Sequence, residues 1–523
     1  MLPSPSSSPT QPPRDILHNC TNLHFEHTAD TGIDSKQRQT PWTYLPTPAK
    51  DAGTKRPSLG SSQSGSRKRI KLQARLEEED ESDEDEKWIE RASQRMQRTR
   101  WSNCFKKNHS RITPKLPTTS TLQTYVSSNK SDIFRCMPLD DNYSAPLYAC
   151  SYSYGAKLGG TAHLAVASEQ GTVHIIDTKK RLDWETEPQR TTLQPHINGI
   201  HDVKWNRSDN LLATCSADQL IKVTEISSAS TLHTLRGHLG AVKCIAWHPQ
   251  HEHLLSSGSR DGNVHIWDLR TWNNGQGLSP VATIHGAHDG LEYNPRRAKN
   301  VATVRDTVTN LIFGDGMTLI TSGSTDGILR GWDLRFATET KKNKSAKNKR
   351  TLALISSPFD PTMRHQSRRP RGILSLTSGA YSTGGLLLAL GADTRIHAYS
   401  ANSLTALSHT YTHPKMQTNA SFYLNISASP CGKWLATGSA GMTGSAFIFD
   451  VSDAATPYAQ TTAGVELHGQ QAGDVGSVDW AADGTLALGA DDGTVRVWRP
   501  DIEVYRSCLE DPSEKKWDWS WSS

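Results

Sequence analysis

A strand-turn-strand pattern recurs from about residue 145 to about residue 500 and restricts the possible folds more than any other feature of this chain. Each copy contains an apolar run, a turn, a second apolar run that ends in Ser-Gly-Ser or a similar triplet, and a third run that ends in Trp-Asp or its equivalent. Alignment on the third run gives seven equivalent positions: Ile176, Thr224, Trp267, Trp332, Tyr399, Phe449 and Trp498. We therefore expect one structural unit that occurs seven times.

The third copy carries the pattern most completely. It reads Gly237-His238, two apolar runs, Asp261-Gly262, and a third run that ends at Trp267-Asp268. These residues at this spacing are typical of a WD repeat, whose copies form small antiparallel sheets around a central axis. The alternation of side chains along each run fits strands that are covered on both faces by neighbouring sheets. The sequence thus predicts an all-β fold, a seven-bladed WD-repeat β-propeller over residues 131–505.

The aligned positions are unevenly spaced, which indicates insertions. Their separations are 48, 43, 65, 67, 50 and 49 residues, whereas a blade of this type takes roughly 40–45 residues. The two long intervals contain insertions near residues 286–306 and 337–371. The second insertion consists of two segments that are rich in Lys and Arg, Lys341–Arg350 and Arg364–Arg371.

Closure of the predicted ring requires one more strand. Little strand-like sequence follows Trp498, so we expect the outermost strand of the last blade to come from residues 122–138, ahead of the first repeat. This pairing would cover two sheet edges that otherwise favour aggregation. Residues 506–523 are predicted to be a short tail with Trp517, Trp519 and Trp521. We expect these indoles to pack along the propeller, because exposed indoles reduce solubility.

The first 130 residues differ in composition from the repeats. They are rich in Pro, Ser, Thr and blocks of charge, and they contain too few apolar residues to offset the entropy of chain ordering. We predict a long disordered N-terminal arm. Two basic clusters within it predict a nuclear signal, and hence a location in the nucleus: Lys55, Arg56, Arg67, Lys68 and Arg69.

An acidic run and a short helix are predicted farther along the arm. Residues 77–86 are acidic except for Ser82, and like charges keep such a run extended. The run is compatible with contacts to basic proteins, with folding back on the basic cluster, and with a purely solubilising role. Residues 86–100 carry a narrow apolar stripe at helical spacing. Docking in a partner groove and packing on the propeller rim are both open for this helix.

Several classes of protein are not expected from this sequence. It contains no stretch of roughly 20 apolar residues and no signal peptide, so an intracellular protein without membrane contact is expected. The eight cysteines lack the spacing of zinc sites or disulfide frameworks, and the histidines lack the spacing of a metal site. Phosphate-binding glycine motifs are also missing. No metal or other cofactor is expected.

Four residues of the third copy have the identities of a catalytic constellation: His238, Ser257, Asp261 and Trp267. In WD repeats such residues form a hydrogen-bonded chain that satisfies buried polar groups and exposes no nucleophile. Partial copies are predicted in the fourth repeat, with Ser322, Asp326 and Trp332, and in the last one, with His468, Asp492 and Trp498. Because a catalytic site would not be copied from blade to blade, we interpret the four residues as structural and expect no enzyme activity.

The tetrapeptide Trp-Asp-Leu-Arg ends both the third and the fourth repeat. It consists of Trp267, Asp268 and Arg270 in one repeat and of Trp332, Asp333 and Arg335 in the next. Each Arg follows the third strand, so both guanidinium groups are expected on one face of the propeller, one blade apart. Pairing of each Arg with its own Asp at the surface is one interpretation, and contributes little. A bidentate clamp for acceptor groups of a partner is the other.

Paired Trp-Asp-x-Arg sequences resemble the motif of propeller receptors that dock on the damaged-DNA-binding adaptor of cullin-four RING ubiquitin ligases. Within that class the chain resembles the denticleless/Cdt-two-type receptors over residues 145–500, notably in the segments 196–205, 258–270, 284–288 and 420–430. The resemblance implies a non-catalytic subunit that binds the adaptor and the cullin-RING core. It also implies substrates that are bound to proliferating-cell nuclear antigen (PCNA), such as the replication licensing factor, with only indirect contact to DNA.

The substrate is expected on the face opposite the paired arginines, because connections between blades emerge there. Basic residues in the two long loops would steer acidic partners toward that face: Arg296, Arg297, Arg368, Arg369 and Arg371. A WD-repeat scaffold for chromatin or ribonucleoprotein assembly is the alternative function, in which the acidic run contacts basic proteins and the paired arginines are incidental.

Overall fold

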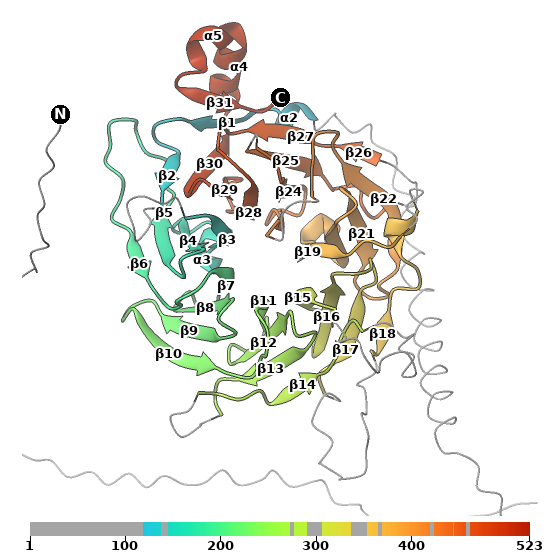
Figure 1. Ribbon diagram of the computed structural model, residues 1–523. Coiled ribbons are helices and arrows are strands. Elements are labelled where there is room, and N and C mark those ends of the chain that lie inside the picture. Colours follow the sequence, from blue (N-terminus) through green and yellow to red (C-terminus); the bar gives the residue numbers. More distant parts are fainter. Residues whose placement is uncertain are drawn as a thin grey trace, which may run out of the picture. The chain divides into compact units, whose positions relative to one another are not determined.

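The computed structural model describes residues 119–136, 145–271, 277–289, 306–335, 353–364, 369–418, 423–442, 444–456 and 461–523. The predicted nuclear signal, acidic run and short helix of the arm lie outside these ranges, as do residues 290–305, 336–352 and 365–368 of the insertions. The described residues form seven sheets that surround a central axis, so the predicted seven-bladed propeller is confirmed (Figure 1).

Each blade has an innermost, second, third and outermost strand in antiparallel order. The first three blades contain β3 (Leu147–Tyr152), β4 (His163–Ser168), β5 (Val173–Asp177) and β6 (Thr191–Leu193); β7 (Ile200–Trp205), β8 (Leu211–Ser216), β9 (Ile221–Glu225) and β10 (Ser230–Leu235); and β11 (Val242–Trp247), β12 (Leu254–Ser259), β13 (Val264–Asp268) and β14 (Ala282–Ile284).

The next three blades follow the same order. They contain β15 (Val308–Phe313), β16 (Thr318–Gly323), β17 (Arg330–Asp333) and β18 (Ile355–Ser356); β19 (Ile373–Ser378), β20 (Leu386–Gly391), β21 (Ile396–Ser400) and β22 (Ala406–Thr412); and β23 (Ile426–Ala428), β24 (Trp434–Gly438), β25 (Ser445–Asp450) and β27 (Val465–His468). An additional strand, β26 (Thr461–Ala463), pairs in parallel with β22 of the fifth blade.

The aligned third-strand residues occupy the same place in every blade. Each one pairs with a leucine of the second strand, and both partners are buried. The seven pairs are Ile176 and Leu164, Thr224 and Leu212, Trp267 and Leu255, Trp332 and Leu319, Tyr399 and Leu387, Phe449 and Leu435, and Trp498 and Leu486. The structure therefore confirms the alignment of the seven copies.

Side chains of the innermost strands join neighbouring blades. The Asp202 carboxylate accepts a hydrogen bond from the Ile245 backbone N–H at 3.1 Å, and Asp479 accepts one from Tyr152 at 2.7 Å. The second contact links the last blade to the first, so it contributes to ring closure. The Trp205 indole adds a further link by donating to the Ser151 carbonyl at 2.9 Å.

The last blade closes with strands from both ends of the chain. Its innermost, second and third strands are β28 (Val475–Trp480), β29 (Leu486–Ala490) and β30 (Thr494–Pro500). Strand β30 pairs with β1 (Tyr125–Ser128) and β2 (Ile133–Arg135). The added strands come from the interval that was predicted to close the ring. A further strand, β31 (Trp519–Trp521), pairs with the outer edge of β1.

The C-terminal segment forms two helices and one strand. Helix α4 (Ile502–Glu510) begins at the N-cap Asp501 and crosses the expected boundary at residue 505, and α5 (Pro512–Lys515) follows. Trp519 and Trp521 are partly buried in β31, as expected for packing, whereas Trp517 is 74% exposed. The remaining described helices are short: α2 (Thr119–Leu122), α3 (Tyr154–Lys157) and the 3-10 turns Pro361–Met363 and Tyr381–Thr383.

The propeller has two faces that carry different connections. We call the end where third strands finish, such as β13 at Asp268, the third-strand face. We call the opposite end, where an outermost strand leads to the next blade, the connection face. Strand β18 lies within the second insertion and pairs with β17. The two segments of this insertion, 341–350 and 364–371, therefore lie before and after β18 in the sequence.

Candidate interaction sites

The two Trp-Asp-Leu-Arg sequences form the same structure in neighbouring blades. The Asp268 carboxylate accepts hydrogen bonds from the Arg270 backbone N–H and side-chain Nε, both at 3.0 Å, and from Nη2 at 2.7 Å. Asp333 holds Arg335 in the same way, with N at 3.0 Å and Nε at 2.9 Å. The Arg270 and Arg335 side chains are 67% and 69% exposed. Each guanidinium is therefore held in one orientation while most of it faces solvent.

The charges within each pair reinforce this geometry. The hydrogen bonds from Arg270 hold the pKa of the Asp268 carboxyl below its usual value, and Arg335 has the same effect on the pKa of Asp333. Both carboxylates remain ionised at neutral pH and keep the guanidinium groups oriented. The interpretation as a surface pair and the interpretation as a clamp are thus compatible, because pairing with Asp prepares the group for a partner.

A guanidinium at this position is confined to two adjacent blades. The strand registers place other residues at the equivalent position of the remaining five blades: Lys179, Ser227, Asn402, Ser452 and Asp501. Lys179 has the same backbone contact, because its N–H donates to Asp177 at 3.0 Å. Of the third strands in the described part of the chain, only β13 and β17 therefore end in the Asp-held fork, and they present it on the third-strand face.

The tetrad of the third blade is a continuous hydrogen-bonded chain. Asp261 lies 3.1 Å from Nδ1 of His238, whose Nε2 lies 2.7 Å from the Ser257 hydroxyl, and the Trp267 indole donates to that hydroxyl at 2.9 Å. Burial raises the pKa of Asp261, but the hydrogen bond and charge of His238 outweigh it and lower the pKa to about 2. Ser257 is fully buried. The chain thus satisfies polar groups and presents no accessible nucleophile.

The partial copies of this hydrogen-bonded tetrad in other blades differ from the prediction. In the fourth blade His288 and the Trp332 indole both contact Thr321, not Ser322, and Asp326 pairs with Arg330. His468 is exposed and lies at the end of β27 in the sixth blade, and the Trp498 indole of the last blade has no hydrogen-bond partner among the described residues. Both predicted partial copies are therefore wrong in their details.

A copy that the sequence reasoning missed lies in the second blade. His196 contacts Asp218 at 2.8 Å and the Thr214 hydroxyl at 2.9 Å. Threonine replaces serine there, and Thr224 replaces the tryptophan. The usable signal is the interval between His196 and Asp218, which is one residue shorter than the interval between His238 and Asp261.

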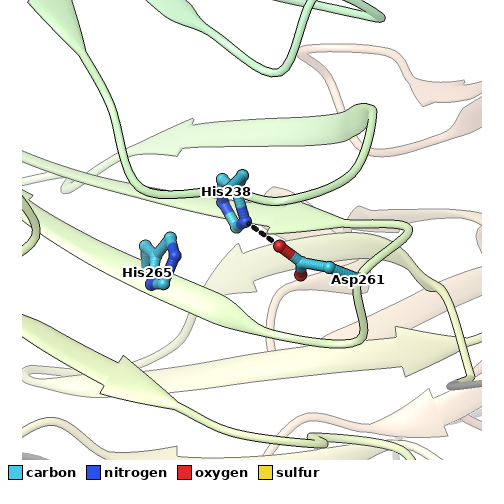
Figure 2. A group of neighbouring side chains, drawn as sticks. All are labelled: His238, Asp261 and His265. Carbon is cyan, nitrogen blue, oxygen red and sulfur yellow. Dashed lines mark hydrogen bonds and ion pairs between the residues drawn. The ribbon is translucent and has the colours of Figure 1, made fainter.

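His265 lies beside the tetrad, and together with His238 and Asp261 it brings three possible metal ligands within 4.8 Å of one another (Figure 2). Both nitrogens of His238 are already engaged, and Asp261 also accepts the Leu239 backbone N–H at 2.8 Å. His265 contacts the Thr283 hydroxyl through Nδ1 at 2.9 Å. A metal ion would have to displace these bonds, so the arrangement fits a hydrogen-bonded core better than a metal centre.

The basic residues expected on the substrate face are only partly described. Arg364 stacks on Phe359 at 4.5 Å and donates to the Leu407 carbonyl at 2.7 Å, so its side chain serves local structure. Arg369 and Arg371 are exposed, and Arg371 lines a central cavity. Arg296, Arg297 and Arg368 lie outside the described residues. No described helix is both long enough and apolar enough to cross a membrane.

Similarity to known proteins agrees with the repeat architecture. Residues 187–224, 229–268 and 462–499 match the WD domain, G-beta repeat family. The chain is 30% identical over 418 residues to the denticleless protein homolog A of Xenopus laevis, covering 75% of this chain and 53% of the relative. It is 30% identical over 392 residues to the denticleless protein homolog of Danio rerio, covering 71% of this chain and 55% of the relative.

A fungal relative is similar to the same degree. The cell division cycle protein cdt2 of Schizosaccharomyces pombe is 30% identical over 356 residues, covering 65% of this chain and 66% of the relative. The chain spans about half the length of the animal relatives that it matches. The similarity therefore includes the propeller and leaves a large part of those relatives unmatched.

Proposed function

Because this chain is a WD-repeat protein of the denticleless/Cdt2 type, we propose that it is the substrate-recognition subunit of a cullin-RING E3 ubiquitin ligase. In this role the propeller docks on the damaged-DNA-binding adaptor and recruits PCNA-associated replication and cell-cycle proteins for ubiquitination. The subunit supplies binding surfaces, while the ligase core supplies the chemistry. The absence of an exposed nucleophile at the Ser257 tetrad supports a non-catalytic role.

The observation that carries the proposal is the pair of Asp-held guanidinium groups on β13 and β17. Both lie on the third-strand face, in neighbouring blades, and both are oriented before any partner arrives. A planar guanidinium with fixed orientation suits bidentate recognition of carboxylate or carbonyl acceptors, and preorganisation reduces the entropy lost on binding. Arg270 and Arg335 therefore suit an adaptor contact.

Substrate is placed on the connection face in this proposal. Adaptor and substrate then bind at opposite ends of the propeller, so both can be held at the same time. Of the basic residues that the sequence assigns to this face, Arg369 and Arg371 are described and exposed.

Affinity capture of the tagged full-length chain from cells tests this function. The adaptor and the cullin should co-purify with the wild-type chain, with a stronger substrate signal after DNA damage. Capture of histones or assembly factors without any ligase component would reject the receptor function in favour of a scaffold. An Arg270→Ala/Arg335→Ala double variant should lose the adaptor and the cullin together.

A further inference from the structure

The propeller encloses a central cavity of about 1150 Å³ that is lined mainly by the innermost strands. Two carboxylates and five Lys or Arg residues are among the lining residues. Both carboxylates are paired, since Asp202 lies 3.1 Å from Lys204 and Asp479 lies 2.8 Å from Lys157. Three cations of the lining have no such pairing with a carboxylate of the described residues, and we call them the mouth cluster: Lys243, Arg260 and Arg371.

The mouth cluster lies at one end of the cavity. Lys243 is the second residue of β11, which begins on the connection face. Arg260 directly follows β12, which ends on that face, and Arg371 precedes β19, which begins there. Arg260 and Arg371 are exposed, so the cluster is accessible to solvent. The paired arginines of the proposed adaptor contact lie on the opposite face.

The side chain of Lys243 lies between aromatic groups. A register shift between Val242 and Cys244 marks a bulge at this residue. Its ammonium lies 3.4 Å from Nε2 of His201 and 5.5 Å from the centre of the Tyr423 ring. Nδ1 of His201 donates to the Val242 carbonyl at 2.8 Å, so Nε2 is the acceptor for the ammonium. No carboxylate of the described residues lies within salt-bridge distance of Lys243.

The electrostatic balance at Lys243 favours an anion. Burial lowers the pKa of Lys243, and the charge of Arg260 lowers the pKa further. Only the thiols of Cys215 and Cys244 oppose these effects. A negative group between Lys243 and Arg260 would relieve their repulsion and replace the water that Lys243 has lost.

Further groups around the cluster suit a bound side chain. The rings of Tyr148 and Tyr423 stack with centres 3.9 Å apart and planes at 10°, and His201 stacks beside them. Thr418 also lines the cavity. It is 2% exposed, and its hydroxyl has no hydrogen-bond partner within the described part of the chain. An aromatic wall and an unused buried hydroxyl therefore accompany the three cations.

We propose that the mouth cluster is a binding site for a phosphorylated side chain of a partner peptide. A phosphate group carries about 1.5 to 2 negative charges at neutral pH and three acceptor oxygens, which matches several cations and a hydroxyl better than a single carboxylate does. The two exposed guanidinium groups would hold the phosphate and Lys243 would contact it from below. The cavity lies within a ring of blades, so it suits one side chain rather than a nucleic-acid duplex.

This inference deepens the proposed function, because it assigns a chemical class to substrates on the connection face. The test uses the full-length chain and a fluorescein-labelled degenerate peptide pool with a central phosphothreonine, followed by anisotropy. Matched pools carry threonine or glutamate at that position. Wild type should bind the phosphothreonine pool at least about tenfold more tightly than the threonine pool, as expected for charge-assisted hydrogen bonds.

Variants locate the site. Lys243→Met keeps the length of the side chain and removes the charge, and an Arg260→Ala/Arg371→Ala double variant changes only exposed residues. Each should reduce binding of the phosphothreonine pool to the level of the threonine pool. Lys179→Ala removes a cation from the third-strand face and should change nothing. If Lys243→Met does not fold, the double Arg variant alone decides the outcome.

Three results would overturn the proposal. The first is equal binding of the phosphothreonine and threonine pools, and the second is an undiminished preference in the double Arg variant. The third is equal binding of the glutamate pool, which would assign the site to carboxylates. Adaptor binding is measured on the same samples. A wild-type chain that prefers phosphothreonine but does not bind the adaptor would reject the receptor function and leave the phosphate site supported.

Discussion

Truncation of Arg270 or Arg335 to alanine should abolish tight adaptor binding without unfolding the propeller. In the free chain, Asp268 and Asp333 each occupy the Nε–Nη2 edge of one guanidinium, and the exposed remainder is directed to solvent. Docking would cover this remainder. Alanine would then leave two groups unpaired in the contact, the partner's acceptor and the carboxylate that the arginine had neutralised.

The expected weakening of adaptor binding follows from these two unpaired groups. Removal of one member of a desolvated charged pair typically weakens binding by roughly thirty- to several-thousand-fold. If the two forks act independently, the factors of the single variants should multiply in the double variant. The fold should be unaffected, because both side chains lie past the strands and outside the core. We expect melting temperatures within about 2 °C of wild type.

The assay pairs thermal melting with adaptor binding by calorimetry or interferometry. Lys179→Ala is the matched control, since it removes a cation from the equivalent position of the first blade. Arg270→Lys and Arg335→Lys keep the charge and lose the planar fork, so they should bind less tightly than wild type. Wild-type adaptor binding by both alanine variants would refute the clamp and favour the scaffold function.

Four further outcomes are expected. Alanine at all five basic residues of the predicted nuclear signal should move a tagged chain to the cytoplasm, and unchanged nuclear fluorescence would remove that signal. Charge reversal of the connection-face loop residues should slow substrate capture as judged by stopped flow, yet spare adaptor binding: Arg296, Arg297, Arg368, Arg369 and Arg371. Ser257→Ala should destabilise the fold by about 1–3 kcal/mol in urea titrations, because His238 and Trp267 lose a buried partner. The lowered pKa of Asp261 contributes stability that is present above its usual pKa of 3.8 and lost as pH falls toward about 2, so Asp261→Asn should weaken this acid dependence of melting.

Local pattern was sufficient to predict the blades. Each third-strand position combines a large or β-branched residue with a leucine of the preceding strand, and these pairs recur in all seven blades. The closing strands were predicted for a different reason, because an open last blade would leave exposed edges. The strand β31 was missed. Its three residues are too short to give a periodic signal, and they pair with β1, which lies almost four hundred residues earlier in the chain.

The wrong prediction of a tetrad in the fourth blade shows how one additional residue changes which side chains meet. In the third blade, Asp261 lies six residues after the second-strand Leu255, and in the second blade Asp218 lies six residues after Leu212. In the fourth blade, Asp326 lies seven residues after Leu319. Alignment on Asp-Gly therefore selects Ser322, whereas strand pairing selects Thr321.

Side chains alternate across a strand, so this shift of one residue directs Ser322 away from the indole and Thr321 toward it. The extra residue also displaces Asp326 from the histidine, and the carboxylate pairs with Arg330 instead. The histidine of this blade keeps its contact with Thr321 but loses the charged partner that orients His196 and His238. Insertion of a residue is thus enough to turn a complete tetrad into an ion pair beside a neutral histidine, although the blade retains its fold.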